Sequence, residues 1–188
     1  MAKFKVTFTL DEADASYFRS LYRKAKKGAV GQDPAKIIRE AKAIVKEVRA
    51  SKKTPAFVSE AISVLSDLTD LIQDDAYAAP KNVTSQVLAA IAYFSNPEDL
   101  IPDHIPGLGF LDDAIMVKFI EEEFKHELWG YRKFCKLRDE SEQRPWSSAG
   151  RDRLGKRIET DRKKIRADIA KREAKDSEKK KARGYLGW

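Results

Sequence analysis

Cysteine, histidine and the usual catalytic motifs are scarce in this chain. Its 188 residues include one cysteine and two histidines, so no internal disulfide can form, which fits a reducing compartment. No glycine-rich phosphate loop, zinc-type cysteine set or nucleophile elbow is present. We interpret Cys135 as a small residue on a helix face rather than a reactive thiol. Because catalytic groups can converge from distant positions, these absences argue against an enzyme without excluding one.

Long apolar runs are also missing. The longest uncharged stretch, residues 82–97, contains Ser, Thr, Gln and Asn and ends at a proline, whereas a membrane-spanning helix needs about 20 mostly apolar residues. The N-terminal segment KFKVTFTLDE alternates polar and apolar residues and lacks the continuous apolar region of a signal peptide. We therefore expect a cytoplasmic protein with neither a transmembrane helix nor a secretory signal.

Positive charge is concentrated at one end of the chain. Residues 144–188 hold 16 of the 37 Lys and Arg and 7 of the 30 Asp and Glu, a net charge of +9, which leaves 21 and 23, a net charge of −2, for residues 1–143. We divide the chain into a helical domain at residues 1–140, a linker at 141–150 and a basic tail at 151–188 that is helical or partly disordered. This asymmetry predicts a polyanionic partner for the tail: nucleic acid, an anionic membrane surface or an acidic protein.

The tail has only a thin apolar stripe of four residues, Leu154, Ile158, Ile165 and Ile169. We therefore expect a marginal helix over roughly residues 151–182 that is too polar to bury. Two interpretations stay open: a solvated helix that adds solubility, and an arm that orders on a polyanion, with Tyr185 and Trp188 available to stack or to lie at lipid headgroups. The candidate polyanion-binding residues are Arg151, Arg153, Lys156, Arg157, Arg162, Lys163, Lys164, Arg166, Lys171, Arg172, Lys179, Lys180, Lys181 and Arg183.

Apolar periodicity predicts an all-α fold for the domain that precedes the linker. Start signals at Asp33-Pro34 and Thr54-Pro55, and a capping-box pattern from Thr9 to Glu12, precede stretches with helical spacing. We expect an antiparallel bundle of about five helices, followed by the charged helical tail. The helices are expected at about residues 11–27, 34–51, 55–74, 83–94 and 114–135.

A short β-strand is expected before the first helix. Its apolar residues alternate with polar ones and are Phe4, Val6, Phe8 and Leu10. Since one strand cannot satisfy its own hydrogen-bonding groups, pairing with a second copy in a homodimer is one solution.

Residues 93–117 are the most specific segment of the chain. Three prolines, two glycines and four aspartates stand here between two apolar helical patterns. The prolines cannot lie inside a helix, and the apolar residues are too many to leave in water. We therefore expect a defined loop of several turns that folds back onto the helices it joins.

This segment resembles the YkvA family, a widespread bacterial domain of unknown function. Its hallmark is an aromatic helix end, then a Pro-x-Asp-Leu-Ile-Pro-Asp run, then a Gly-aromatic-Leu-Asp-Asp helix start. The resemblance is specific over about residues 83–120 and looser over about 55–138. The residues that carry it are Tyr93, Pro97, Asp99, Leu100, Ile101, Pro102, Asp103, Pro106, Gly109, Phe110, Leu111, Asp112 and Asp113.

The resemblance implies architecture more than chemistry. The family supplies no established reaction, cofactor or catalytic residue. Other members are reported or expected near membranes, some with spanning helices, so the resemblance also implies a position peripheral to the inner membrane.

An enzymatic or metal site would have to lie in the same loop. Hard divalent cations such as magnesium prefer carboxylate oxygen, and the candidate ligands are Asp99, Asp103, His104, Asp112 and Asp113. In the competing structural interpretation, Asp112 caps the following helix, Asp113 lies in its first turn and the other aspartates stabilise turns. A partner-binding surface is the third alternative.

We interpret the chain as a non-enzymatic interaction module. Its bundle would dock an unidentified protein partner and its basic tail an anionic one, and no cofactor is expected. Glu123 and His126 have the spacing used in carboxylate di-iron bundles, but such a site needs a second pair, so we interpret them as a solvated charged face. The alternative function is a metal-dependent enzyme whose loop aspartates converge in an open pocket.

Overall fold

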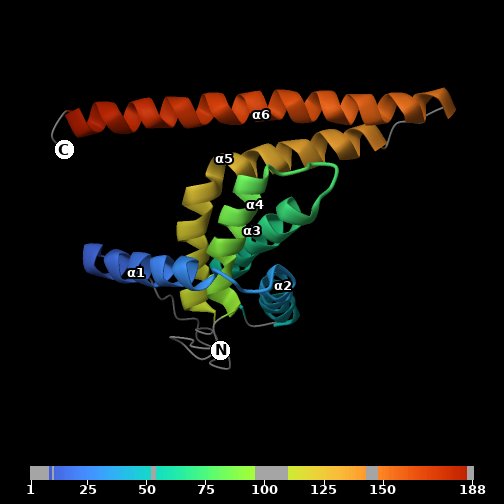
Figure 1. Cartoon of the computed structure of the whole chain (residues 1–188). Coiled ribbons are helices and arrows are strands. Elements are labelled where there is room, and N and C mark those ends of the chain that lie inside the picture. The colour runs from blue at the N-terminus through green and yellow to red at the C-terminus, as the bar shows by residue number, and fades with distance from the viewer. Residues whose placement is uncertain (1–8, 10, 52–53, 96–109, 143–147, 186–188) are drawn as a thin grey trace, which may run out of the picture.

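The computed structural model describes residues 9, 11–51, 54–95, 110–142 and 148–185, and their side chains except at 142, 148–153 and 182–185. All regular structure in these ranges is helical, which confirms the all-α class (Figure 1). The elements are α1 (Glu12–Gly28), α2 (Pro34–Ala50), α3 (Ala56–Gln73), α4 (Lys81–Ile91), the 3-10 helix η1 (Ala92–Ser95), α5 (Leu111–Glu142) and α6 (Ser148–Tyr185). The expected N-terminal strand falls on residues outside the described ranges.

Local signals account for the starts of the first two helices. Asp11 caps α1: its side chain accepts from the backbone of Asp14 at 2.9 Å, and its own N–H donates to the Asp14 carboxylate at 3.1 Å. The capping box expected from Thr9 to Glu12 is therefore wrong by two residues. Asp33 caps α2 as predicted, because its carboxylate accepts from the N–H of Ala35 at 3.0 Å.

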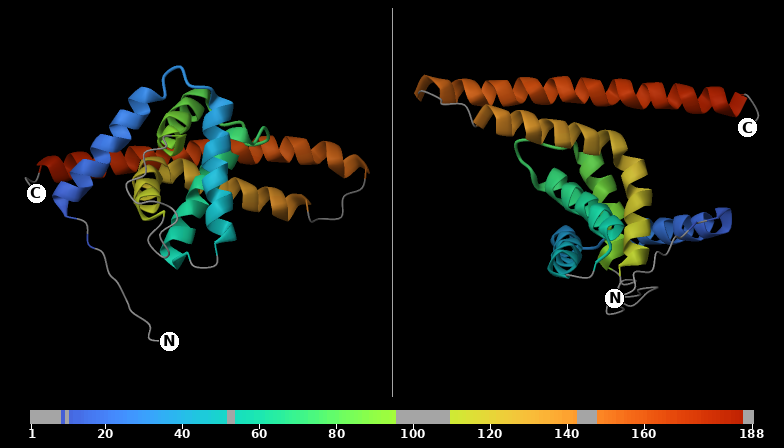
Figure 2. Two further views of the ribbon diagram at one scale, coloured as in Figure 1. Left: turned by 90° about the horizontal axis from the view of Figure 1, so that it is seen from below. Right: turned by 180° about the vertical axis from the view of Figure 1, so that it is seen from behind.

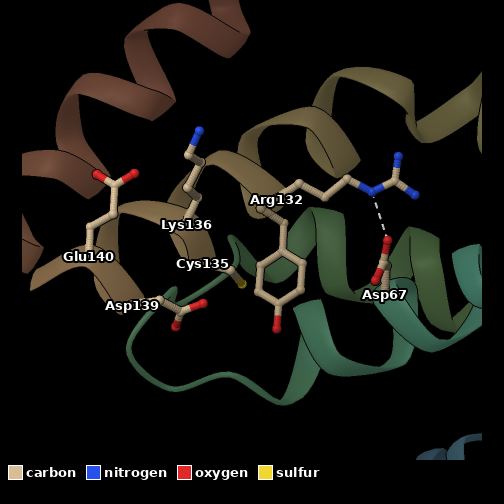
Figure 3. A pocket seen from close by; sticks show the side chains of 7 residues that line it. Asp67, Arg132, Cys135, Lys136, Asp139 and Glu140 are labelled. Carbon is tan, nitrogen blue, oxygen red and sulfur yellow. Dashed lines mark hydrogen bonds and ion pairs between the residues drawn. The ribbon is translucent and has the colours of Figure 1, made fainter. Parts of the chain in front are cut away.

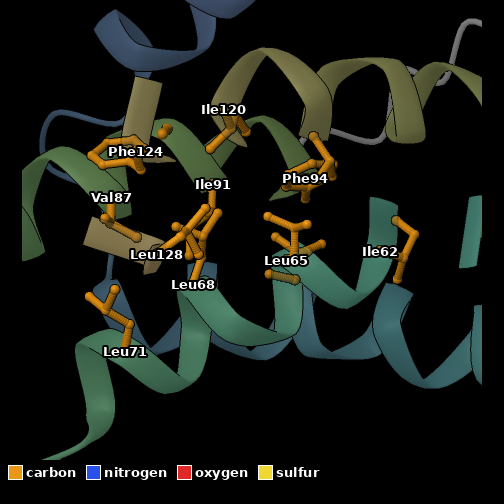
Figure 4. Close-up of a cluster of buried hydrophobic side chains, with 14 of the residues drawn as sticks. Ile62, Leu65, Leu68, Leu71, Val87, Ile91, Phe94, Ile120, Phe124 and Leu128 are labelled. Atoms are coloured by element: carbon orange, nitrogen blue, oxygen red, sulfur yellow. The ribbon is translucent and has the colours of Figure 1, made fainter. Parts of the chain in front are cut away.

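The core lies where α3 packs between α2 and α5. Each of the three helices contributes a stripe of aliphatic side chains, and α4 and η1 close one side of the cluster (Figure 4). Among the residues with at most 1% exposed surface are Leu65, Leu68 and Leu71 of α3, Ile91 of α4, and Ile120 and Leu128 of α5. Such burial is the main stabilising term of the bundle.

Helix α5 changes direction at Phe124, whose backbone angles (φ −103°, ψ 15°) are not helical. Both parts contribute residues to the core, and the part after the kink also runs beside α6 (Figures 1 and 2). Gly130 lies at the crossing, where a Cβ atom would be 2.5 Å from Cδ1 of Ile169. A glycine therefore allows the two helices to approach closely.

Helix α6 is docked rather than solvated along its whole length. Ile165 and Ile169 are 1% and 3% exposed, so the expectation that this segment is too polar to bury is wrong for its middle. Among the described side chains, the last ion pair with α5 is made by Asp176. From Ser177 to Lys181 every side chain is exposed, and this end of α6 extends beyond the kink of α5 (Figure 1).

Candidate functional site

The described part of the proline-rich motif is built into the core. Phe94 of η1 and Ile120 of α5 meet in the cluster of Figure 4, and Tyr93 lies half-buried with its ring edge-on to Phe94 at 5.2 Å. Phe110 precedes α5 with a positive φ of 63°, a conformation that bulky residues rarely adopt. Its ring is 5% exposed, so packing holds the residue in this strained conformation.

Two of the predicted metal-binding aspartates lie at the start of α5. Asp112 and Asp113 are 3% and 5% exposed, and both belong to the first turn, where negative charge faces the positive end of the helix dipole. Because α5 begins at Leu111, Asp112 lies inside the helix and not at the cap position we expected. The buried placement agrees with the structural interpretation more closely than with an open cation site.

The remaining motif residues lie outside the described ranges: Pro97, Asp99, Leu100, Ile101, Pro102, Asp103, His104, Pro106 and Gly109. Within the residues that the structure describes, no group of three or more His, Cys, Asp or Glu side chains is arranged to hold a metal ion. Convergence of the four aspartates therefore stays a prediction.

The Glu123 and His126 pair is divided between two helices. Glu123 turns toward α1, where it accepts from the hydroxyl of Tyr22 at 2.9 Å and from Nζ of Lys26 at 2.7 Å. His126 turns toward α6, with Nε2 3.1 Å from the carboxylate of Asp176. The two side chains are helix-packing contacts and do not share a site.

A partly buried polar network joins the α3–α4 connection to α5. The carboxylate of Asp74 accepts from Nη1 of Arg138 at 2.6 Å, from the hydroxyl of Tyr131 at 3.4 Å and from the N–H of Tyr77 at 3.0 Å. Burial acts to raise the pKa of Asp74, but the hydrogen bonds from Tyr77, Arg138 and Ala76 and the charge of Arg138 outweigh it and hold the pKa below its ordinary value. Asp74 is thus kept charged as a structural anchor.

A second network joins α6 to the same region. Nη1 of Arg166 lies 2.8 and 2.7 Å from the two carboxylate oxygens of Glu127, and the hydroxyl of Tyr77 donates to Glu127 at 3.1 Å. The guanidinium also stacks 4.3 Å from the centroid of the Tyr77 ring. Burial, followed by the charge of Glu127, raises the pKa of Tyr77. With a neutral tyrosine and a carboxylate that is hydrogen-bonded on both oxygens, this network holds the helices together and is not arranged as an acid–base pair.

Two open hollows flank the exposed side of α5. One, of about 460 Å³, lies between Asp67 of α3 and α5, and Arg132 spans it to reach Asp67 at 2.7 Å (Figure 3). Burial raises the pKa of the Cys135 thiol in its wall, so the reactive thiolate is disfavoured. The other hollow, of about 420 Å³, surrounds Trp129 and is lined mostly by Lys and Arg. Neither hollow contains the residues of a catalytic centre that we recognise.

The predicted polyanion-binding residues whose side chains are described fall into two groups. Five are engaged within the protein: Arg157 with Asp161, Arg162 with the carbonyl of Ala76, Lys163 with Glu159, Arg166 with Glu127 and Arg172 against Trp129. Six are exposed without an ion pair among the described side chains: Lys156, Lys164, Lys171, Lys179, Lys180 and Lys181. The side chains of Arg151, Arg153 and Arg183 lie outside the described set.

Sequence reasoning missed four residues of this basic region. Lys175 is exposed on α6, and Trp129, Lys133 and Lys136 lie on the part of α5 beside it. Their seven-residue and four-residue spacings were visible in the sequence, but only the docking of α6 on α5 places them next to the tail. The sequence shows the basic residues of each helix, but it does not show that the two helices pack side by side.

Comparison with known proteins finds similarity in the motif segment. Residues 85–119 match the model of a family described as a protein of unknown function, DUF1232. A Bacillus subtilis (strain 168) protein described as "Uncharacterized membrane protein YkvA" is 50% identical over 46 residues, which are 24% of this chain and 43% of that protein. The chain thus spans less than half the length of this relative. No solved structure matches the chain significantly.

The description as a membrane protein applies to the B. subtilis relative. Among the helices described here, none combines the length and the apolar character needed to cross a bilayer. The family model matches the segment that carries the proline and aspartate motif. The comparisons thus support the resemblance to the YkvA family that the motif indicates, and they do so over a part of the chain.

Proposed function

We propose that this chain is a non-enzymatic interaction module that attaches through the basic end of α6 to an anionic membrane surface. The observation that carries the proposal is the division of α6 into two parts. Up to Asp176 the helix is held against α5, and beyond it Lys179, Lys180 and Lys181 are exposed and free of ion pairs among the described side chains. Unpaired charges on a projecting helix are available to a partner.

The charge of the tail supports electrostatic attachment rather than insertion. Positive charge near an anionic leaflet contributes about 1 kcal/mol for each Lys or Arg at the surface. Residues 170–181 of α6, whose side chains are described, are all charged or small and provide no apolar face that would enter the hydrocarbon. The B. subtilis relative, described as a membrane protein, supports a membrane over nucleic acid as the anionic partner.

The test measures binding of the full chain to lipid vesicles. We expect sedimentation with phosphatidylglycerol vesicles, no sedimentation with phosphatidylcholine vesicles, and a steep loss of binding as salt rises. Changing Lys179, Lys180 and Lys181 together to Gln should weaken binding about 100-fold, since three surface charges supply about 3 kcal/mol. Binding that is indifferent to salt and to this variant would contradict the proposal.

A matched control removes the same charge elsewhere. Lys24, Lys27 and Lys46 are exposed on α1 and α2 without ion pairs among the described side chains. Their triple change to Gln lowers the net charge equally, so its binding should stay close to that of the parent. A parallel titration with single-stranded nucleic acid tests the other polyanion, and preference for it would also overturn the proposal.

A further inference from the structure

The side of the α5–α6 pair that carries Trp129 is organised by alternating contacts between the two helices. Arg172 of α6 lies 3.7 Å from the centroid of the Trp129 ring, and Lys133 of α5 lies 4.9 Å from it. Nζ of Lys133 in turn contacts the carboxylate of Asp168 at 3.0 Å. The three cationic and aromatic groups therefore meet on one side of the helix pair.

The contacts also fix the alignment of the helices. Lys133 pairs with Asp168, and eight residues earlier on α5, Lys125 pairs with Asp176, eight residues later on α6. The helices are thus antiparallel, and on each of them a step of seven residues, close to two turns, returns to nearly the same side. Side chains that share a face with Trp129 on α5 and with Asp168 on α6 lie on one common surface.

That surface is basic. On α6, Lys164, Lys171 and Lys175 follow one another at spacings of seven and four residues and stand beside Asp168 on the helical wheel. On α5, Lys136 lies seven residues after Trp129 and lines the hollow around it. All four lysines are exposed and have no ion pair among the described side chains. The hydrogen bond from Lys133, opposed by burial and aided by the charges of Lys133, Lys171 and Arg172, lowers the pKa of Asp168.

We infer that this surface, the Trp129 face (Trp129, Lys136, Lys164, Lys171 and Lys175), lies against the phosphates of an anionic lipid bilayer with the indole at headgroup level. The inference rests on the proposed function and adds a second contact to the one at the end of α6. It predicts that the helix pair lies along the membrane, instead of standing away from it on a tethered tail.

Two features of the face favour lipid over nucleic acid. The guanidinium of Arg172 and Nζ of Lys133 already lie 3.7 and 4.9 Å from the centroid of the indole ring, so less of the ring is open to a stacked base. An indole flanked by Lys and Arg is the combination typical of membrane–water interfaces. The lysines also stand along a straight helix over roughly 16 Å, from Lys164 to Lys175, which suits a flat surface.

The test uses Trp129 as the reporter in the full chain. Trp146→Phe and Trp188→Phe leave Trp129 as the sole tryptophan. Phosphatidylglycerol vesicles brominated near the headgroup should quench its fluorescence, and phosphatidylcholine vesicles with the same bromination should not. In the same background, changing Lys136, Lys171 and Lys175 to Gln should weaken binding at least about tenfold and reduce the quenching.

The outcomes separate this inference from the proposed function. The Trp129 face is contradicted, and the tail contact is left standing, by two results together. The first is strong binding without quenching of Trp129. The second is a Lys136/Lys171/Lys175 variant that weakens binding no more than the triple change at Lys24, Lys27 and Lys46. Absence of any vesicle binding by the parent would overturn both. Because every changed lysine is exposed, we expect the lysine variants to fold as the parent does. Thermal melts of all variants check this expectation.

Discussion

The buried ion pair between Glu127 and Arg166 makes a quantitative prediction about the docking of α6. Arg166→Met keeps most of the side-chain length but removes the charge and its hydrogen bonds to Glu127 at 2.7 and 2.8 Å. The Glu127 side chain is only 10% exposed, so the variant leaves a carboxylate that neither water nor a cation fully stabilises.

The magnitude follows from burial. Breaking one side of a fully buried ion pair costs about 3–5 kcal/mol. Since the Arg166 side chain is 23% exposed, water can partly replace it, and we expect a loss of about 2–3 kcal/mol in the free energy of unfolding. For a chain of this size such a loss lowers the melting temperature by roughly 5–10 °C.

Denaturant titration followed by circular dichroism provides the measurement. Adding Glu127→Gln to Arg166→Met should restore much of the loss, because the amide still accepts from Tyr77 and carries no charge. The control is Arg157→Met on the same helix, whose 3.9 Å pair with Asp161 is more exposed and is worth about 0.5 kcal/mol or less. If Arg166→Met is as stable as the parent, or if the double variant loses as much as both single variants together, the docked arrangement of α6 is wrong.

Three further predictions concern the helix crossing, an anchor and the motif. Gly130→Leu should lower the free energy of unfolding by about 1–3 kcal/mol, because it clashes with Ile169 while keeping good helix propensity; a stability equal to the parent would exclude close packing. The pKa of Asp74 is lowered in the folded protein, so its contribution to the free energy of unfolding is present above pH 3.8 and is lost as the pH falls through the folded pKa. In urea titrations, the difference in stability between the parent and Asp74→Asn should therefore become smaller below pH 3.8. A difference that stays constant with pH would contradict this prediction. Because Asp112 and Asp113 are buried in a helix turn, millimolar magnesium should leave the melting temperature unchanged, and a rise in the parent that Asp112→Asn abolishes would instead support a metal site.

The sequence carried most of the information on the helices themselves. Asp33-Pro34 predicted the start of α2 because a capping carboxylate followed by proline is a local signal that needs no tertiary context. At α1 the signal was present twice, and the pair Asp11 and Asp14 formed the capping box instead of the pair we chose. Ambiguity of this kind shifts a helix end by a residue or two and leaves the fold class intact.

The docking of α6 was not predictable in the same way. With only four large aliphatic residues in 38, this helix cannot bury a face by itself. What anchors it is a buried pair between Arg166 and Glu127, 39 residues apart, and a glycine that opens space for Ile169. In the sequence, Arg166 is one of many basic residues and Gly130 is an unremarked glycine within a helix, so neither reveals its partner.

The same fact changes how the tail should be tested. If the tail were a solvated helix that does not pack on the bundle, removal of residues 151–188 would leave the bundle folded and would test polyanion binding directly. In the structure that truncation also removes Ile165, Ile169 and the counterion of Glu127, so it exposes apolar surface on α5 and leaves a buried carboxylate unpaired. Loss of binding in such a truncated chain would therefore report unfolding as readily as loss of a contact. Only changes confined to exposed lysines, compared with equal changes on α1 and α2, separate the residues that hold α6 in place from those that remain available to a partner.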